Sequence, residues 1–327
     1  MTEPTLLDNE PVFLIADSEG LTTDSLSNAI HVPQILVIGV GDLGCYIGAS
    51  LLKQQFDRLS GLLVSRKPNL LSVIDCADTL LVHTDAETPF DEDGIYCARL
   101  LIEKADLVLL VGALGGSSGA PLVSLAEYCN RLNVPVVGTV VLPFAFEGKP
   151  KNNKANEALL TLNSICNGML VLPNDRLKLA LSPNTSAFDA LNAGNLFISE
   201  LLRDLLQVLG QTGLINLDFN DFITFIRDAR TLAPFRVSFS NGEIDWTSLI
   251  ANQFKSSLLA DVRLETVTSA LVHFSVSADF SLGLMHEFLD ALYETCPKLQ
   301  QVLSGVTVMQ ADTGKLKVLL ITSSARL

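Results

Sequence analysis

The chain has 327 residues, of which 48% are hydrophobic and 18% are charged, and its formal net charge is −14. This length suffices for two packed domains of ordinary size. The negative charge argues against nucleic acid as a partner, because phosphates must be neutralised by Lys and Arg. It also disfavours electrostatic attraction to anionic lipid.

Nothing near the N-terminus resembles a signal peptide, and no apolar run approaches the ~20 residues of a membrane span. The 6 cysteines form no C-x-x-C pair, and the 4 histidines are scattered. These residues therefore predict no metal site and no disulfide framework. We interpret the chain as a cytoplasmic protein with reduced thiols and no direct membrane insertion.

The first part of the chain alternates apolar runs with helical stretches. Continuous apolar runs are typical of strands buried on both faces of a parallel sheet. The alternation predicts an α/β fold with an open, doubly wound, mostly parallel sheet. In chain order we predict strands or short apolar runs at Val32–Val40, Leu70–Cys76, Thr79–His83, Leu107–Val111, Pro135–Val141 and Met169–Leu172, and helices at Gly44–Phe56, Ala120–Leu132 and Asn153–Cys166.

A long amphipathic helix is predicted at Asn184–Leu209, and the pattern changes after it. The final third predicts a second, smaller α/β domain, whose last two strands flank a hairpin-like Ala-Asp-Thr-Gly turn. Its predicted strands are Phe235–Phe239, Ala270–Val276, Val306–Gln310 and Leu316–Ile321, and its predicted helices are Trp246–Leu259 and Leu282–Cys296.

The first glycine-rich turn follows the first predicted strand. Gly39, Gly41 and Gly44 match the G-x-G-x-x-G fingerprint of dinucleotide-binding proteins, in which backbone N–H groups approach a pyrophosphate. An oxidoreductase using NAD(P) is therefore one interpretation. That fingerprint also needs an acidic residue at the end of a second strand, and Asp57 lies in the helix-like stretch Gln54–Leu59.

A second glycine-rich turn precedes the helix at Ala120–Leu132. Glycines and hydroxyls at a helix N-terminus form a nest for phosphates, and two such turns suit a triphosphate held from both sides. The alternative is that these glycines serve tight packing alone. The candidate residues of the turn are Gly115, Gly116, Ser117, Ser118 and Gly119.

The segment Gly213–Phe222 places Asn216, Asp218 and Asp221 just after the long helix. Two carboxylates three residues apart can share one water and act as a general base. The alternative is that Asn216 and Asp218 cap the helical run that follows, as these residue types commonly do.

Several of these segments, in this order, resemble the FtsZ branch of the tubulin superfamily. The resemblance covers nearly the whole chain from Gln34. The matching segments are the first strand and turn (Ile35–Gly41), His83-Thr84-Asp85-Ala86, the second glycine turn, Pro143-Phe-Ala-Phe-Glu147-Gly148-Lys149, Leu172-Pro-Asn-Asp175-Arg-Leu, the loop Gly213–Phe222, Ser257–Val262 and Ala278–Ser281.

The resemblance implies an N-terminal extension (1–33), a tubulin/FtsZ-type GTPase domain (34–183), a central helix (184–212) and an activation domain (213–327). It also implies head-to-tail filaments, in which Asp218, Asp221 and Asn216 of one copy complete the GTP or GDP site of the next, with Mg²⁺ if hydrolysis is retained. The residues that it implies at the nucleotide are Gly39, Gly41, Gly44, Asp85, Gly115, Gly116, Ser117, Ser118, Gly119, Glu147, Lys151 and Asn195.

The chain departs from that family at the nucleotide. Asp42 stands in the first turn, Lys151 replaces the usual Arg, Leu196 replaces the guanine-reading Asp, and the stretch from Asp85 to Ala105 is short. We therefore expect weakened nucleotide binding and slow or absent hydrolysis, in membrane remodelling or scaffolding. A polymer or dimer that has lost its nucleotide is the alternative. The chain stops at Leu327 after the last predicted strand, so we expect a membrane adaptor other than the usual division anchors.

Overall fold

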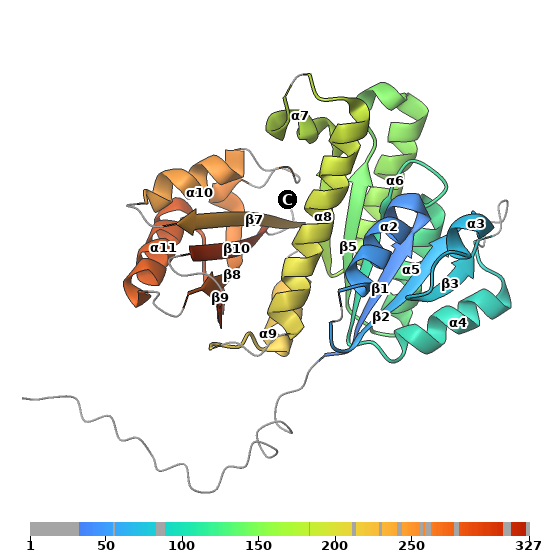
Figure 1. Cartoon of the computed structure of the whole chain (residues 1–327), viewed down its shortest axis with the longest axis horizontal. Coiled ribbons are helices and arrows are strands. Elements are labelled where there is room, and N and C mark those ends of the chain that lie inside the picture. Colours follow the sequence, from blue (N-terminus) through green and yellow to red (C-terminus); the bar gives the residue numbers. More distant parts are fainter. Residues whose placement is uncertain are drawn as a thin grey trace, which may run out of the picture. The chain divides into compact units, whose positions relative to one another are not determined.

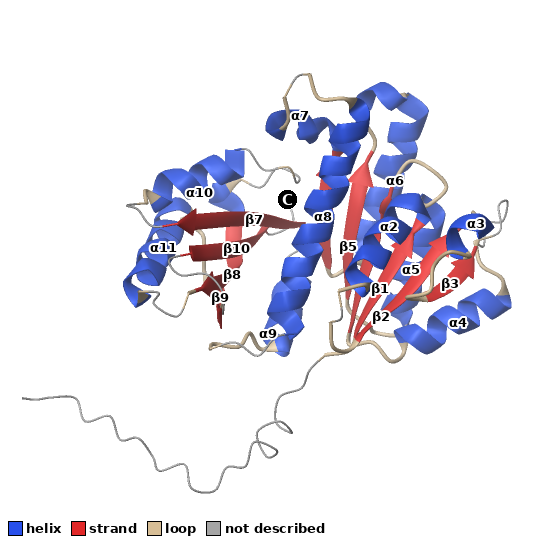
Figure 2. Cartoon of the chain, viewed as in Figure 1, coloured by secondary structure: helices blue, strands red, loops and turns tan. Residues whose placement is uncertain are grey.

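The central element of the structure, a computed structural model, is a 10-stranded sheet with the order β3-β2-β1-β4-β5-β6-β7-β10-β8-β9 (Figure 2). All described residues belong to the unit Val32–Leu327. They are residues 33–54, 56–82, 89–182, 184–210, 214–228, 231–240, 244–255, 258, 263–277, 281–309 and 315–324.

The first half of the sheet is parallel throughout, from β3 to β6 (Figure 1). Most of its side chains are buried, which is why these strands appear in the sequence as continuous apolar runs. The strands are β1 (Ile35–Val40), β2 (Leu59–Ser65), β3 (Asp78–Leu81), β4 (Leu107–Ala113), β5 (Val136–Leu142) and β6 (Gly168–Pro173).

Helices cover both faces of this parallel half, as doubly wound folds require. One apolar core lies between the sheet and α2, α8 and α9, and the other lies between the sheet and α4, α5 and α6. The helices are α2 (Gly41–Leu52), α3 (Pro68–Leu71), α4 (Glu92–Ile102), α5 (Gly119–Arg131), α6 (Lys149–Ile165), α7 (Leu177–Ala180), α8 (Ala187–Gly210) and α9 (Phe219–Asp228), with short 3₁₀ turns at Ala145–Glu147 and Asn174–Arg176.

The second half of the sheet is mixed: β10 is antiparallel to β7 and β8, and β8 is parallel to β9. Its core combines aliphatic side chains with a group of aromatic rings, in which Phe288 lies edge-on to both Trp246 and Phe274 at centroid distances of 5.3 and 5.5 Å. The elements are β7 (Thr231–Ser240), α10 (Trp246–Lys255), a 3₁₀ turn (Leu264–Thr266), β8 (Val267–Val276), α11 (Leu282–Thr295), β9 (Gln301–Val308) and β10 (Lys315–Ser324).

The two halves meet at β6 and β7, through the parallel pair Met169 and Thr231. Arg236 on β7 adds a link, because its guanidinium forms ion pairs with Glu200 and Asp204 on α8. Burial raises the pKa of Asp204, although Arg236 opposes that shift. The junction therefore combines backbone pairing with a charged contact.

Two predictions about local structure were wrong, and two elements were missed. The described residues of the stretch Gln54–Leu59 are not helical, because α2 ends at Leu52 and β2 starts at Leu59. Neither β2 nor α4 had been predicted. The hairpin between the last two strands does not form, because β10 inserts between β7 and β8 while β9 joins the far edge in parallel.

The prediction of free thiols is confirmed for all six cysteines, of which Cys97 is exposed. Within the described ranges, no helix is both long and apolar enough to cross a membrane.

Candidate functional site

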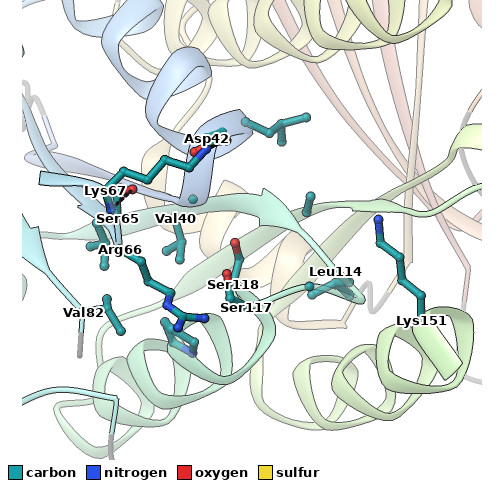
Figure 3. A pocket seen from close by; sticks show the side chains of 16 residues that line it. Val40, Asp42, Ser65, Arg66, Lys67, Val82, Leu114, Ser117, Ser118 and Lys151 are labelled. Carbon is teal, nitrogen blue, oxygen red and sulfur yellow. Dashed lines mark hydrogen bonds and ion pairs between the residues drawn. The ribbon is translucent and has the colours of Figure 1, made fainter. Parts of the chain in front are cut away.

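A cavity of about 360 Å³ opens at the carboxyl ends of β1, β2 and β4 (Figure 3). The chain leaves β1 toward β2 on one side, and β4 lies on the other, so this is a topological switch point of the sheet. Ligands of open α/β sheets bind in such crevices. The lining residues are Val40, Gly41, Asp42, Leu43, Val64, Ser65, Arg66, Lys67, Val82, Ala113, Leu114, Gly116, Ser117, Ser118, Pro121 and Lys151.

Two helices begin at this cavity. α2 starts at Gly41 directly after β1, and α5 starts at Gly119 directly after Ser118. Neither helix has a side-chain hydrogen bond at its N-cap. The first N–H groups of a helix lack intrahelical partners and carry a partial positive charge, so both ends favour an anion.

The backbone at both turns requires glycine. Gly41 has φ +75°, and a Cβ added there would lie 2.2 Å from Ser118 Oγ. Gly115 has φ +86°, and a Cβ there would lie 2.7 Å from the Lys151 carbonyl oxygen. Any other residue would be strained at these positions, so the two turns approach their neighbours as only glycine permits.

Gly39 and Gly44 have a packing role. A Cβ at Gly39 would lie 2.2 Å from the Gly44 carbonyl oxygen, and one at Gly44 would lie 2.4 Å from the Val111 carbonyl oxygen. They hold α2 against β1 and β4 and are not among the residues that line the cavity. Gly115 and Gly119 are also not among them, whereas Gly41, Gly116, Ser117 and Ser118 are.

Sequence reasoning missed two cations of the cavity, Arg66 and Lys67, which directly follow β2. Lys67 Nζ lies 2.5 Å from Asp42 Oδ2, so the carboxylate that interrupts the first glycine turn has a compensating cation. The apolar run Leu62–Val64 was the available signal: recognised as a strand beside β1, it would have brought its carboxyl end to the first turn.

Glu147, in the 3₁₀ turn that precedes α6, forms an ion pair with Lys151 in the first turn of α6. Burial raises the pKa of Glu147, but the Lys151 ammonium and the Phe144 N–H outweigh it and leave this pKa below its usual range. Lys151 lines the cavity and Glu147 does not. Glu147 is therefore connected to the cavity only by its ion pair with Lys151.

Two further predicted nucleotide contacts, Asn195 and Asp85, are not among the described lining residues of the cavity. Asn195 is on α8, half-buried, and is not among the residues that line the cavity. Asp85 lies outside the described residues, although the described Val82, shortly before it, lines the cavity.

The acidic loop between α8 and α9 is exposed at Asn216, Asp218 and Asp221. Asp218 Oδ1 accepts hydrogen bonds from Asn220 N (2.7 Å) and Asp221 N (3.3 Å), so Asp218 caps α9. Ile215 exchanges two backbone hydrogen bonds with Val306 on the edge strand β9, at 3.2 and 2.9 Å. The capping interpretation is confirmed for Asp218, and the loop is held on β9 by its backbone.

The cavity lies at the carboxyl ends of the parallel strands, whereas α8, which leads into the acidic loop, ends near their amino ends. The end of α8, at Leu206 and Gly210, shares a small cavity with Pro33 and Ile35 at the start of β1. The larger cavity lies past the other end of β1. Because α8 has 24 residues, it spans about 36 Å at 1.5 Å per residue. A chain cannot bring its own acidic loop to its own cavity.

The chemistry of the described lining suits phosphates better than Mg²⁺. Backbone N–H groups, Ser117, Ser118 and the three cations can bind a polyanion. Among the described lining residues there is one carboxylate, Asp42, which is already paired with Lys67. Nor do the described residues contain a group of three or more His, Cys, Asp or Glu side chains that could hold a metal.

Comparison with known proteins gives one consistent result, although no family model matches the chain. The cell division protein FtsZ of Coxiella burnetii is 25% identical over 226 residues, which cover 69% of this chain and 58% of that protein. The empty FtsZ dimer of M. jannaschii has a TM-score of 0.77 at 19% identity and covers 93% of both chains. CetZ2 from Haloferax volcanii, solved as a GTPγS-bound protofilament, has a TM-score of 0.73 at 18% identity and covers 90% of this chain and 93% of that one.

The sequence matches and the shared fold agree with each other and with the order of the motifs. The low identity shows that the likeness is a distant one. In sequence the chain is similar to FtsZ proteins at low identity, and it shares the fold of FtsZ and CetZ, so it resembles the FtsZ/tubulin superfamily of cytoskeletal proteins as a divergent, FtsZ-like chain.

Proposed function

We propose that this protein is a filament subunit that assembles head to tail, binds GTP or GDP weakly in the cavity at β1 and β4, and hydrolyses GTP slowly or not at all. It serves membrane remodelling or a scaffold in the cytoplasm, through an adaptor protein. In this proposal residues 34–183 bind the nucleotide, 184–212 form the central helix and 213–327 form the activation domain. The carrying observation is that a phosphate-type cavity lies at the carboxyl ends of the parallel strands, while the helix leading into the acidic loop ends near their amino ends.

The opposed positions favour a head-to-tail contact. A copy stacked on the cavity edge of another would bring its own acidic loop to that cavity. Such a contact is heterologous, so it leaves a free cavity and a free loop at the two ends and produces an open filament. The dimer and the protofilament among the related structures support self-association.

The acidic loop has the groups needed to position a water molecule. The cap uses Oδ1 of Asp218, which leaves the second carboxylate oxygen as an acceptor, and Asp221 is exposed in the first turn of α9. These carboxylates would orient and polarise water against the phosphate chain held by the neighbouring copy. Asn216 would contact that nucleotide. A bound triphosphate would supply the anhydride bond that is cleaved.

The cavity explains why we propose weak binding. The ammonium of Lys151 is paired with Glu147, so it is not a free charge for the ligand. Asn195 is not in the described lining, so the described residues provide little to recognise a guanine base. A base without hydrogen-bonding partners is poorly discriminated from other bases.

Sedimentation and light scattering with GTP, with GDP and without nucleotide test the assembly. We expect filaments, and a monomer at every concentration under all three conditions would refute the proposal. Phosphate release tests the loop. Asp218→Asn keeps a good N-cap while removing the charge, so it should reduce release without destabilising α9. An unchanged release rate would remove Asp218 from the site.

A polymer or dimer that functions without nucleotide is the second candidate, favoured by the absence of α8 residues from the described lining of the cavity. Titration with fluorescent GTP and NADP⁺ separates the candidates. Saturable GTP binding supports the first, no saturable binding supports the second, and NADP⁺ binding alone would support an oxidoreductase.

A further inference from the structure

The cation that follows β2 points into the nucleotide cavity. β2 pairs with β1 in register up to Val64 and Val40, so the residues after Val64 emerge beside the first glycine turn. Figure 3 shows the Arg66 side chain extending toward Ser117 and Ser118, whereas Lys67 turns back toward Asp42. Arg66 is therefore directed at the second glycine turn, where α5 begins.

The three cations of the cavity differ in how their charge is used. Lys67 is paired with Asp42, and Lys151 is paired with Glu147. Arg66 has no ion-pair partner among the described residues. Its side chain is exposed and lines the cavity. Its charge is thus available to an anionic ligand without breaking an ion pair with any residue that the structure describes.

A divalent cation has few ligands in the same space. Mg²⁺ at phosphate sites is commonly held by one or two carboxylates together with the phosphates themselves. The described lining has three cations and one carboxylate, and that carboxylate is held by Lys67. A metal ion at this position would be repelled by Arg66 and Lys67.

We propose that Arg66 binds the phosphate chain of a nucleoside di- or triphosphate in the place of Mg²⁺, so that the nucleotide binds without a divalent cation. The planar guanidinium donates two parallel N–H bonds to a phosphate, which lysine cannot do. This inference rests on the proposed nucleotide-binding function. It assigns a phosphate-binding role to a residue that sequence reasoning missed.

Titration of the full chain with fluorescent GTP and GDP, in buffer with MgCl₂ and in buffer with EDTA, tests the inference. The variants are Arg66→Ala and, as a control of equal charge, Arg263→Ala, which removes an exposed arginine far along the chain and outside the cavity lining. Thermal unfolding of each variant checks that the fold is intact.

For the wild type and Arg263→Ala we expect dissociation constants that differ less than about threefold between the two buffers. For Arg66→Ala we expect a loss of about tenfold or more in EDTA, the usual effect of removing a charge-assisted contact, with partial recovery in MgCl₂.

Two results would overturn the inference and leave the proposed function standing: wild-type binding that is lost in EDTA, or Arg66→Ala binding equal to that of the wild type. Absence of saturable binding in both buffers would overturn the proposed nucleotide binding itself, and the inference with it.

Discussion

At the scale of single residues, the three glycines of the first turn have different structural roles. Gly39 and Gly44 allow α2 to pack closely against the sheet, whereas Gly41 has a positive φ and lies against Ser118 at the cavity. A fingerprint of three glycines thus combines two packing positions with one that shapes the ligand site. Sequence reasoning gave all three the same role, because spacing does not reveal what a missing Cβ would touch.

Replacing Gly41 by Ala should destabilise the fold by about 1–3 kcal/mol and weaken nucleotide binding, because it combines a strained φ with a Cβ against Ser118. Gly116→Ala is the control, since a Cβ there would meet nothing within 4 Å. We expect it to change stability by less than about 0.5 kcal/mol. Urea unfolding measures both, and equal stabilities would contradict the assignment.

His273 should make the protein sensitive to acid. It is buried, with Nε2 3.0 Å from Thr307 Oγ1, and burial lowers its pKa to about 4. The unfolded chain therefore takes up this proton at a higher pH than the folded chain. The contribution is complete above pH ~6.5 and decreases toward pH 4, by about 3 kcal/mol in total.

Urea unfolding between pH 8 and pH 4 measures that loss. His273→Gln should show a smaller decrease of unfolding free energy over this interval, whatever its stability at pH 8. The exposed His286→Gln on α11 should retain the wild-type decrease. Parallel curves for His273→Gln and the wild type would show that His273 is not responsible.

At the scale of elements, the local reasoning succeeded where a segment is buried on both faces or strongly amphipathic. The buried strands β1, β4, β5 and β6 and the helix α8 were all predicted. α4 was missed, because its exposed face carries Tyr96 and Leu100 and obscures the helical pattern. The hairpin was wrong because pairing partners depend on the whole sheet, where β10 has neighbours on both sides.

The acidic loop should depend on its backbone contact with β9. Ile215→Pro removes the N–H that donates to Val306, and Ile215→Ala keeps it. In the proline variant alone we expect faster amide exchange at residues 216–221 and a several-fold higher critical concentration for assembly. The reason is that the lost hydrogen bond contributes about 1 kcal/mol, which corresponds to a several-fold change in an equilibrium constant. Equal exchange and assembly in both variants would show that this contact does not position the loop.

At the scale of the whole molecule, the proposed active site is shared between two copies, and complementation tests this directly. Gly116→Glu places a carboxylate in the cavity, at a position with open space. Asp218→Asn with Asp221→Asn removes the charges of the loop. We expect each variant alone to be inactive in phosphate release.

Mixed in equal amounts, the two variants should recover roughly a quarter of wild-type phosphate release, because random head-to-tail contacts pair an intact cavity with an intact loop in that fraction of sites. Light scattering confirms that the mixture assembles. If the mixture assembles but releases no phosphate, while the wild type measured in parallel does, a site shared between two copies would be excluded.

The sequence by itself determined the α/β class, the two glycine turns, the long helix and the acidic loop, because each follows from local periodicity, backbone freedom or spacing. Only the tertiary structure decided which residues meet. The pairing of β2 with β1 brings Arg66 and Lys67 to the first turn, and the packing of α2 assigns Gly39 and Gly44 to the core. The course of α8 separates the acidic loop from the cavity. These are contacts between distant segments, fixed by strand order and by burial on both faces of the sheet, and no local pattern encodes them.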